Sequence, residues 1–183
     1  MSTAVSQPLF DDQALPIVVM GVSGCGKTSV GQRLSEALQC RFIEGDSLHP
    51  PANIAKMSAG IALTDEDRWP WLDIIGGLIG EGTGRHERVI LSCSALKKVY
   101  RDRLRAAAGG RLAFVFLEGS RAVLEERMKS RSGHFMPPAL LESQLATLES
   151  PRGEPDVVTV DVDLPLAAIV ERALAGLREL PLE

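Results

Sequence analysis

The sequence is poor in cysteine and aromatic residues, and it contains no long hydrophobic run. Its three cysteines, Cys25, Cys40 and Cys93, are far apart in a chain of 183 residues and form no CxxC pair. This pattern argues against a disulfide framework and a zinc site, and it favours a reducing compartment. No apolar run reaches the roughly 20 residues that span a bilayer. The opening MSTAVSQPLFDDQALP lacks the basic and apolar regions of a secretory signal. We therefore expect a cytoplasmic protein with no membrane partner.

An excess of positive charge is also missing. The net charge is −4 and the pI is about 5.5, whereas a general nucleic-acid binder normally has a basic face. Hydrophobic residues make up 45% and charged residues 24% of the chain, the balance of a globular protein. The length fits one domain. We expect a flexible arm over residues 1–15 and a single domain over 16–183.

Short apolar runs alternate with helical patterns along the chain. The expected strands are 16–20, 41–44, 88–93, 112–117 and 157–162. The expected helices are 27–39, 68–80, 97–108, 121–131, 139–148 and 166–177. Because Pro70 is tolerated only in a first helical turn, the second helix should begin near Asp67. Such alternation predicts an α/β fold of three layers, with a parallel sheet of about five strands. The segment 130–155 is rich in Gly, Pro and Ser, which indicates a mobile lid.

The residues GVSGCGKT, from Gly21 to Thr28, fit the pattern GxxxxGK[ST] between an expected strand and an expected helix. Gly24 and Gly26 would let the backbone curl until its N–H groups converge on phosphate oxygens. The N-terminus of the next helix favours the same anion. Lys27 would reach the β- and γ-phosphates of ATP, and the Thr28 hydroxyl would bind Mg²⁺. The alternative is a glycine-rich turn with a surface lysine.

The nucleotide contacts expected from this loop are Gly21, Ser23, Gly24, Cys25, Gly26, Lys27, Thr28 and Ser29. Two interpretations of Cys25 are open. It is either a small spacer or a thiol whose pKa falls at a helix N-terminus, in which case oxidation would inactivate the protein.

Asp46 and His49 follow the second expected strand, in the segment GDSLHP. The carboxyl ends of parallel strands line the ligand crevice of an open sheet. If the second strand neighbours the first, Asp46 lies near the γ-phosphate. It could then accept a proton from an attacking hydroxyl or hold Mg²⁺ through water. The alternative is a helix cap. His49 is either a hydrogen-bonding partner for a polyol or a lone surface histidine.

Arg68 follows the acidic run Asp65, Glu66 and Asp67. Thr64 and Asp67 fit a capping box, and acidic residues favour a helix N-terminus. A cation at this position opposes the helix dipole. We therefore expect Arg68 to face an anion, such as a substrate carboxylate.

The third expected strand ends in Leu91-Ser92-Cys93, without the Asp that most P-loop ATPases use to support Mg²⁺. Asp46 is the candidate for that support. The basic run that follows, 97–105, is expected to be largely a solvated helix face, and Lys97, nearest the strand end, is expected to touch ligand.

Arg127 and Arg131 are four residues apart and share one helix face. One could stack on adenine while the other holds phosphate. The alternative is that they pair on the surface with Glu125 or Glu126.

Together these segments resemble the gluconokinase family, in order from about residue 16 to the end of the chain. The segments that carry the resemblance are GVSGCGKT (21–28), GDSLHP (45–50), NIAKM (53–57), LTDEDRWPWL (63–72), CSALKKVYRDRLR (93–105) and RSGHFMP (131–137). The resemblance implies transfer of the ATP γ-phosphate to the 6-hydroxyl of D-gluconate. It also implies a nucleoside-monophosphate-kinase-like fold with a lid, and usually a homodimer.

By position, the resemblance implies these roles: Asp46 as the base; His49, Lys56, Arg68 and Lys97 as acceptor contacts; Arg127 and Arg131 as lid residues on ATP. Cys25 stands where this family more usually has Ser. Without the resemblance, the residues predict a Mg-ATP kinase for a small hydroxylated anion. The rivals are a shikimate or nucleotide kinase of the same fold, a GTPase-type switch and a non-enzymatic ATP-binding module. The sequence lacks the guanine-reading NKxD motif of a GTPase.

Overall fold

All five strands of the central sheet run parallel, as the alternation of elements predicts. The computed structural model describes residues 15–130 and 138–181. The strands are β1 (Ile17–Met20), β2 (Arg41–Glu44), β3 (Val89–Ser92), β4 (Ala113–Glu118) and β5 (Val157–Asp161). Their order in the sheet is β2-β3-β1-β4-β5. Val18 in the central strand pairs with Leu91 on one side and Phe114 on the other.

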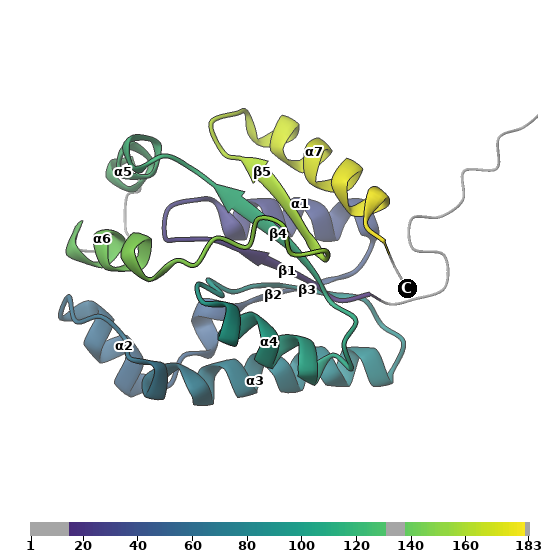
Figure 1. The fold of residues 1–183 in the computed structure, drawn as a ribbon, viewed down its shortest axis with the longest axis horizontal. Helices are drawn as coiled ribbons and strands as arrows, with labels where there is room; N and C mark the ends of the chain where they lie inside the picture. The colour runs from purple at the N-terminus through teal and green to yellow at the C-terminus, as the bar shows by residue number, and fades with distance from the viewer. Residues whose placement is uncertain (1–14, 131–137, 182–183) are drawn as a thin grey trace, which may run out of the picture.

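Helices cover both faces of this sheet (Figure 1). They are α1 (Lys27–Leu38), α2 (Pro51–Ser58), α3 (Asp65–Gly84), α4 (Lys98–Ala107), α5 (Arg121–Lys129), α6 (Pro138–Thr147) and α7 (Leu166–Glu179), with a short 3-10 turn, η1 (Gly45–Leu48). Helices α1 and α7 cover one face and α3 and α4 the other, while α2, α5 and α6 lie at the carboxyl end of the strands. Among the described residues, no helix is both long and apolar enough to cross a membrane.

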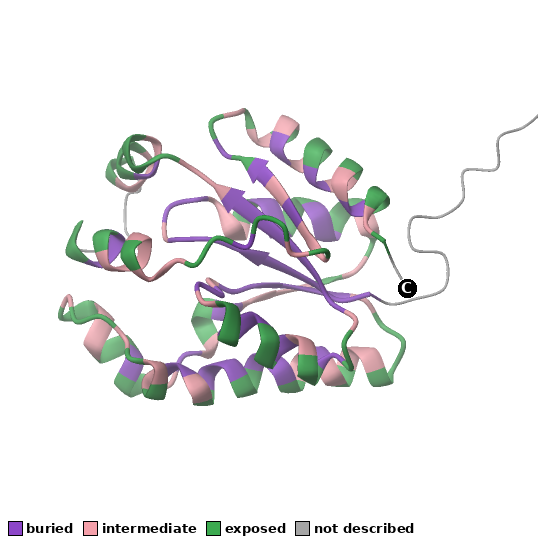
Figure 2. Cartoon of the chain, viewed as in Figure 1, coloured by how far each residue is buried: buried purple, intermediate pink, exposed green. Residues whose placement is uncertain are grey.

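The core is centred on the sheet, drawn mostly in purple in Figure 2, and apolar side chains of the covering helices pack against it. Every residue of β1 is fully buried, and β3 is buried along its whole length. A strand with helices on both sides must be apolar on both faces. The continuous run IVVM of β1 therefore fits the three-layer α/β fold that the sequence predicts.

One premise about the sheet is wrong: β2 does not neighbour β1. Strand β3 lies between them, so the chain must cross the end of β3 before Asp46 can approach the centre of the sheet. Gly45 makes that crossing. A Cβ built on Gly45 would lie 1.8 Å from the carbonyl oxygen of Ser92, so only glycine fits there. Its N–H donates to Ser92 Oγ at 2.9 Å.

Two helices differ from expectation. Helix α3 begins at Asp65, two residues before the predicted start, because Thr64 and Asp67 form the capping box. Pro70 is therefore in the second turn, where it forgoes one helical hydrogen bond. Helix α2 was not predicted. Its signal is Pro51, a proline at the first helical position, where a missing N–H has no consequence.

Two glycine substitutions in helices test the packing of this fold. A Cβ at Gly176 in α7 would lie 2.3 Å from Val158 Cγ1 of β5, whereas a Cβ at Gly77 in α3 meets nothing within 4 Å. We expect Gly176→Ala to lower the free energy of unfolding by about 1–3 kcal/mol through overpacking. Gly77→Ala should raise it by about 0.5–1 kcal/mol through helix propensity. Denaturant titration measures both, and equal effects in the two variants would contradict the packing described.

Candidate active site

The loop from Gly21 to Thr28 joins the buried strand β1 to helix α1, which is the predicted context of a phosphate-binding loop. Gly24 and Gly26 have φ of 83° and 93°, in the left-handed region that favours glycine. Gly26 is the N-cap of α1, and among the described residues no side-chain hydrogen bond caps that helix. Its first N–H groups therefore remain open to an anion.

The side chains of Lys27 and Cys25 differ in where they lie: Lys27 contacts the loop backbone, and Cys25 is buried in the core. The Lys27 ammonium donates to the carbonyl oxygens of Gly21 and Val22 at 3.0 and 3.1 Å, so it lies over the loop itself. Cys25 is fully buried, with its Sγ only 2.7 Å from where a Gly21 Cβ would be. This burial supports the interpretation of Cys25 as a spacer, because an oxidant needs access to the thiol.

Glu44 is a site residue that the sequence analysis missed. The Thr28 hydroxyl donates to its carboxylate, and Ser92 Oγ donates to Glu44 Oε1 at 2.5 Å. Glu44 and Ser92 end neighbouring strands in register. Strand β3 ends without the Asp that supports Mg²⁺ in most P-loop ATPases. Glu44 at the end of β2 places a carboxylate beside that position. Mg²⁺ prefers oxygen ligands such as hydroxyls and carboxylates, so the side chains of Thr28 and Glu44 fit that ion. Glu44 could have been found from the sequence as a carboxylate at the end of an expected strand, directly before Gly45.

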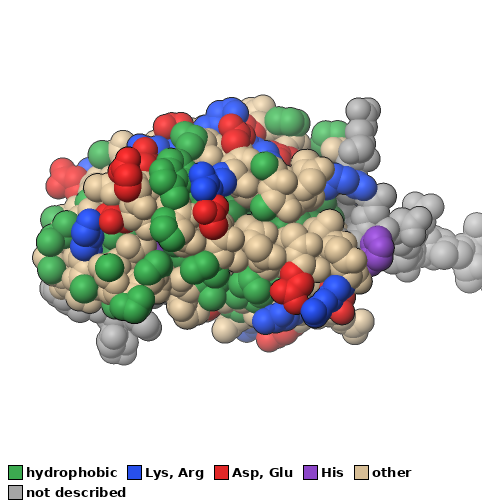
Figure 3. Space-filling model, turned by 90° about the horizontal axis from the view of Figure 1, so that it is seen from below, with side chains coloured by type: hydrophobic (Ala, Val, Ile, Leu, Met, Phe, Trp, Pro, Cys, Tyr) green, Lys and Arg blue, Asp and Glu red, His purple; other side chains and the backbone are tan. Residues whose placement is uncertain are grey.

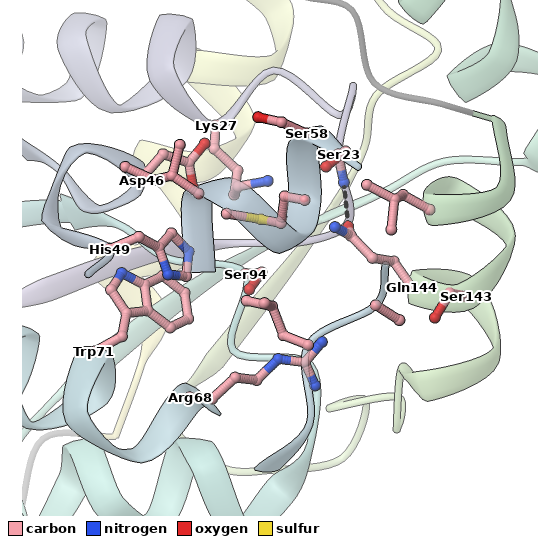
Figure 4. Close-up of a pocket in the computed structure, with 15 residues that line it drawn as sticks. Ser23, Lys27, Asp46, His49, Ser58, Arg68, Trp71, Ser94, Ser143 and Gln144 are labelled. Carbon is pink, nitrogen blue, oxygen red and sulfur yellow. Dashed lines mark hydrogen bonds between the residues drawn. The ribbon is translucent and has the colours of Figure 1, made fainter. Parts of the chain in front are cut away.

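A cavity of about 250 Å³ lies beside the loop (Figure 4). It brings together five of the predicted site residues: Ser23 and Lys27 from the loop, Asp46 and His49 from the segment after β2, and Arg68 from α3. Lys56, Lys97 and Arg127 are not among the residues that line it. The remaining walls come from α2, from Ala62 and Leu63 after it, from Trp71 of α3, from Ser94 after β3 and from α6.

Arg68 is buried, with 7% of its surface exposed. Its Nη1 donates to the Tyr100 hydroxyl at 2.7 Å, and that hydroxyl in turn donates to Asp65. Within the described ranges, no carboxylate lies at ion-pair distance from Arg68. A buried cation is expensive unless it is paired. The guanidinium at the cavity wall therefore suits an anionic ligand.

Lys56 and Lys97 are already paired at the start of α3. Lys56 Nζ contacts Asp67 at 2.7 Å and Lys97 Nζ contacts Asp65 at 3.0 Å. The hydrogen bond from Lys56 lowers the pKa of Asp67 to about 2. Hydrogen bonds from Tyr100 and then Lys97 lower the pKa of Asp65. Both lysines thus stabilise a helix start, and their contact with an acceptor stays a prediction.

His49 is a buried wall of the cavity and not a surface histidine. Its ring stacks on Trp71, with centroids 4.0 Å apart and planes 15° from parallel. Burial lowers its pKa to about 4. The imidazole is therefore neutral near pH 7.

Arg127 lies beside the phosphate loop. Its Nη1 would be 3.6 Å from a Cβ on Gly26, and its Nη2 donates to the carbonyl oxygen of Val162. In the part of the chain that the structure describes, it forms no ion pair with Glu125 or Glu126, so the surface-pairing alternative does not hold for Arg127. Arg131 lies outside the described residues.

The end of the expected lid is fixed to α4. Arg101 is buried, and its Nη2 donates to Glu149 O at 3.0 Å and to Glu154 at 2.9 Å. Arg105 adds ion pairs to Glu154 and Asp156 at 2.8 and 2.7 Å. The basic run is therefore not a solvated face at these two positions. Of the segment 130–155, residues 131–137 lie outside the description, and motion of the rest stays a prediction.

Helix α6 reaches the phosphate loop through Gln144. The Ser23 N–H donates to Gln144 Oε1 at 2.8 Å, the dashed contact in Figure 4. N–H groups of such a loop are the groups that hold phosphate oxygens. The carboxamide oxygen thus stands where a phosphate oxygen would compete for the same donor.

Comparison with known proteins agrees with this site. The profile of the AAA domain family matches residues 17–151. The thermosensitive gluconokinase of Escherichia coli K12 is 44% identical, over 85% of this chain and 83% of its own. The gluconokinase of Gluconobacter oxydans is 48% identical, over 79% and 80%. The crystal structure of a gluconokinase from Sinorhizobium meliloti 1021 superimposes with a TM-score of 0.83 at 62% identity, covering 90% of this chain and 92% of that one. The chain belongs to the gluconokinase family. Its P-loop domain and its three-layer α/β fold agree with this membership.

The contact between Gln144 and the loop predicts a competition in this gluconokinase-family site. We expect Gln144→Ala to tighten nucleoside triphosphate binding about two- to tenfold, because a neutral hydrogen bond contributes about 0.5–1.5 kcal/mol and no longer has to be broken. Ser143→Ala, which changes the neighbouring cavity residue, is the matched control. Calorimetric titration measures the affinity. Weaker binding by Gln144→Ala would show that the side chain assists the nucleotide.

Proposed function

We propose that this protein transfers the γ-phosphate of ATP to the 6-hydroxyl of D-gluconate, giving 6-phosphogluconate and ADP. The observation that carries the proposal is Arg68. It is a buried guanidinium without a carboxylate partner in the described chain, and it lines the same cavity as Lys27 and Asp46. A hydroxylated carboxylate offers an anion for Arg68 and a hydroxyl for Asp46. The family membership supports gluconate as that acceptor.

The donor side of the site is the phosphate loop. The N–H groups of the loop and of the α1 N-terminus would hold the phosphates, while Lys27 leaves its carbonyl partners for the β- and γ-phosphates. Thr28 and Glu44 would hold Mg²⁺, which neutralises charge on the phosphates when it is bound. Arg127, beside Gly26, would contact the same nucleotide.

On the acceptor side, Asp46 is proposed as the base. The attacking hydroxyl forms a bond to the γ-phosphorus, the bond from that phosphorus to the leaving oxygen of ADP breaks, and Asp46 takes the hydroxyl proton. Lys27 stabilises the charge that gathers on the transferring group. Arg68 orients the acceptor through its carboxylate, a two-pronged contact that a guanidinium can form.

We also propose a cytoplasmic homodimer. All three cysteines are free, which suits a reducing compartment. Apolar side chains lie among charged ones on the face of α2, α3 and α4 in Figure 3. Four large hydrophobic residues are exposed among the described residues: Ile54, Ile61, Ile74 and Val99. An interface between two copies would cover some of them.

The reaction itself is tested by ADP formation. The purified protein with Mg-ATP should release ADP rapidly only when D-gluconate is added, and shikimate or nucleoside monophosphates should not replace it. Asp46→Asn should lower kcat about a hundredfold or more, the usual contribution of a general base, with little change in melting temperature. A strong response to shikimate or to a nucleotide in place of gluconate would assign the protein to a rival kinase class.

Arg68 is expected to recognise the acceptor carboxylate. A charge-assisted contact contributes about 1.5–3 kcal/mol, so Arg68→Ala should raise the KM for gluconate about ten- to a hundredfold and leave the KM for ATP near wild type. Arg68→Lys should recover part of the loss, because an ammonium cannot form the two-pronged contact. Steady-state kinetics on the three proteins separates the two substrates. A rise confined to the KM for ATP would move the carboxylate contact to Lys56 or Lys97.

A further inference from the structure

Asn53 contacts His49, which lines the cavity, and is itself almost completely buried, with 3% of its surface exposed. It belongs to α2, and its side chain bridges that helix to α3. The same amide nitrogen, Nδ2, makes two contacts: it donates to the backbone carbonyl of Asp67 at 2.9 Å, and it lies 3.2 Å from Nδ1 of His49.

These two contacts determine which imidazole nitrogen carries the proton. A backbone carbonyl can only accept, so the group that faces Asp67 O must be the NH₂ of Asn53 and not its oxygen. The second hydrogen of that NH₂ then points to His49 Nδ1. Because it receives a hydrogen, Nδ1 must offer its lone pair. In a neutral imidazole the other nitrogen, Nε2, then carries the proton.

The plane of the ring is fixed as well. His49 stacks on Trp71, and Trp71 Nε1 donates to Gly45 O at 2.8 Å. In the described part of the chain, Nε2 has no hydrogen-bond partner, and His49 lines the cavity. Nε2–H is therefore the polar group that His49 offers to a bound molecule.

We propose that Asn53 is a positioning residue that holds His49 as a neutral Nε2–H donor to an oxygen of the bound acceptor. This assignment rests on the proposed function and adds a division of roles to it. His49 cannot act as a base on the acceptor, because its lone pair is engaged by Asn53. Asp46, in the same cavity, is left as the acceptor of the proton, and a polyol finds both a donor and an acceptor for its hydroxyl groups.

The charged groups around His49 agree with a neutral ring. Burial acts most strongly to lower its pKa, and the cation of Arg68 acts in the same direction, while the carboxylate of Asp46 opposes both. The contact from Asp67 is made by its carbonyl through Asn53. Its carboxylate is engaged by Lys56.

The wild-type protein provides the first test, without any variant. Two-bond ¹H–¹⁵N correlation spectra of the histidine-labelled full chain report which ring nitrogen is protonated. The chain has three histidines, and His49→Gln identifies the His49 signals by their loss. We expect a protonated Nε2 and a bare Nδ1 from pH 6 to 8. A protonated Nδ1, or a mixture of the two forms, would overturn the proposal.

Two matched variants separate positioning from packing. Asn53→Ala and Asn53→Asp both lose the bond to Asp67 O, so any loss of stability from that bond is common to them. Only the carboxylate of Asn53→Asp accepts a hydrogen from Nδ1, so only this variant should move the proton to Nδ1 and make His49 titrate nearer neutral pH. Asn53→Ala should give a mixture. An unchanged Nε2–H form in Asn53→Asp counts against a positioning role.

Kinetics then links the tautomer to the acceptor. We expect Asn53→Asp to raise the KM for gluconate about three- to tenfold, the value of one neutral hydrogen bond, with the KM for ATP near wild type. A rise in KM for ATP alone would contradict the placement of His49 at the acceptor. If the spectra show the predicted tautomer while gluconate is not phosphorylated, the positioning role stands and the proposed substrate fails.

Discussion

The carboxylate of Glu44 joins the ends of two strands to the phosphate loop. It accepts hydrogen bonds from Thr28 at the start of α1 and from Ser92 at the end of β3. Ser92 in turn accepts from the N–H of Gly45. Hydrogen bonds to a charged acceptor are stronger than neutral ones. This carboxylate therefore fixes where the chain leaves β2, and with it the position of Asp46 and His49 relative to Lys27.

Charge around the start of α3 explains why Arg68 remains open to a ligand. Asp65 and Asp67 stabilise the positive end of the helix dipole, and each also takes one lysine. Tyr100 adds a hydroxyl between Asp65 and Arg68. Arg68 is thus held in place through a neutral group instead of being neutralised by a carboxylate. This absence of a carboxylate partner in the described chain is why we propose that Arg68 binds an anionic acceptor.

The elements with strong local signals could be predicted from the sequence. The buried strands, the phosphate loop and the α/β layers follow from apolar runs and a spaced glycine pattern, and Lys27, Asp46, His49 and Arg68 do meet in one cavity. The spatial order of strands could not be predicted, because adjacency in the chain does not fix adjacency in a sheet. The sequence also did not predict the roles of three side chains, those of Glu44, Asn53 and Gln144. Each acts through a partner that is distant in sequence or on another element.

The walls of the cavity are supported by different kinds of contact, which bears on how one fold can serve different acceptors. The phosphate loop follows the buried strand β1, and Asp46 follows Gly45, whose N–H is bonded to Ser92 at the end of the buried strand β3. The donor geometry is therefore tied to the core. His49 and Arg68 instead depend on side-chain contacts between α2, α3 and α4, through Asn53, Trp71 and Tyr100. Substitutions of these three supporting side chains can alter the acceptor site without disturbing the phosphate loop. Acceptor identity therefore lies in the site and not in the fold. In this chain we propose that it is carried by His49 as a neutral donor, by the carboxylate of Asp46 and by the buried cation of Arg68, which share one cavity.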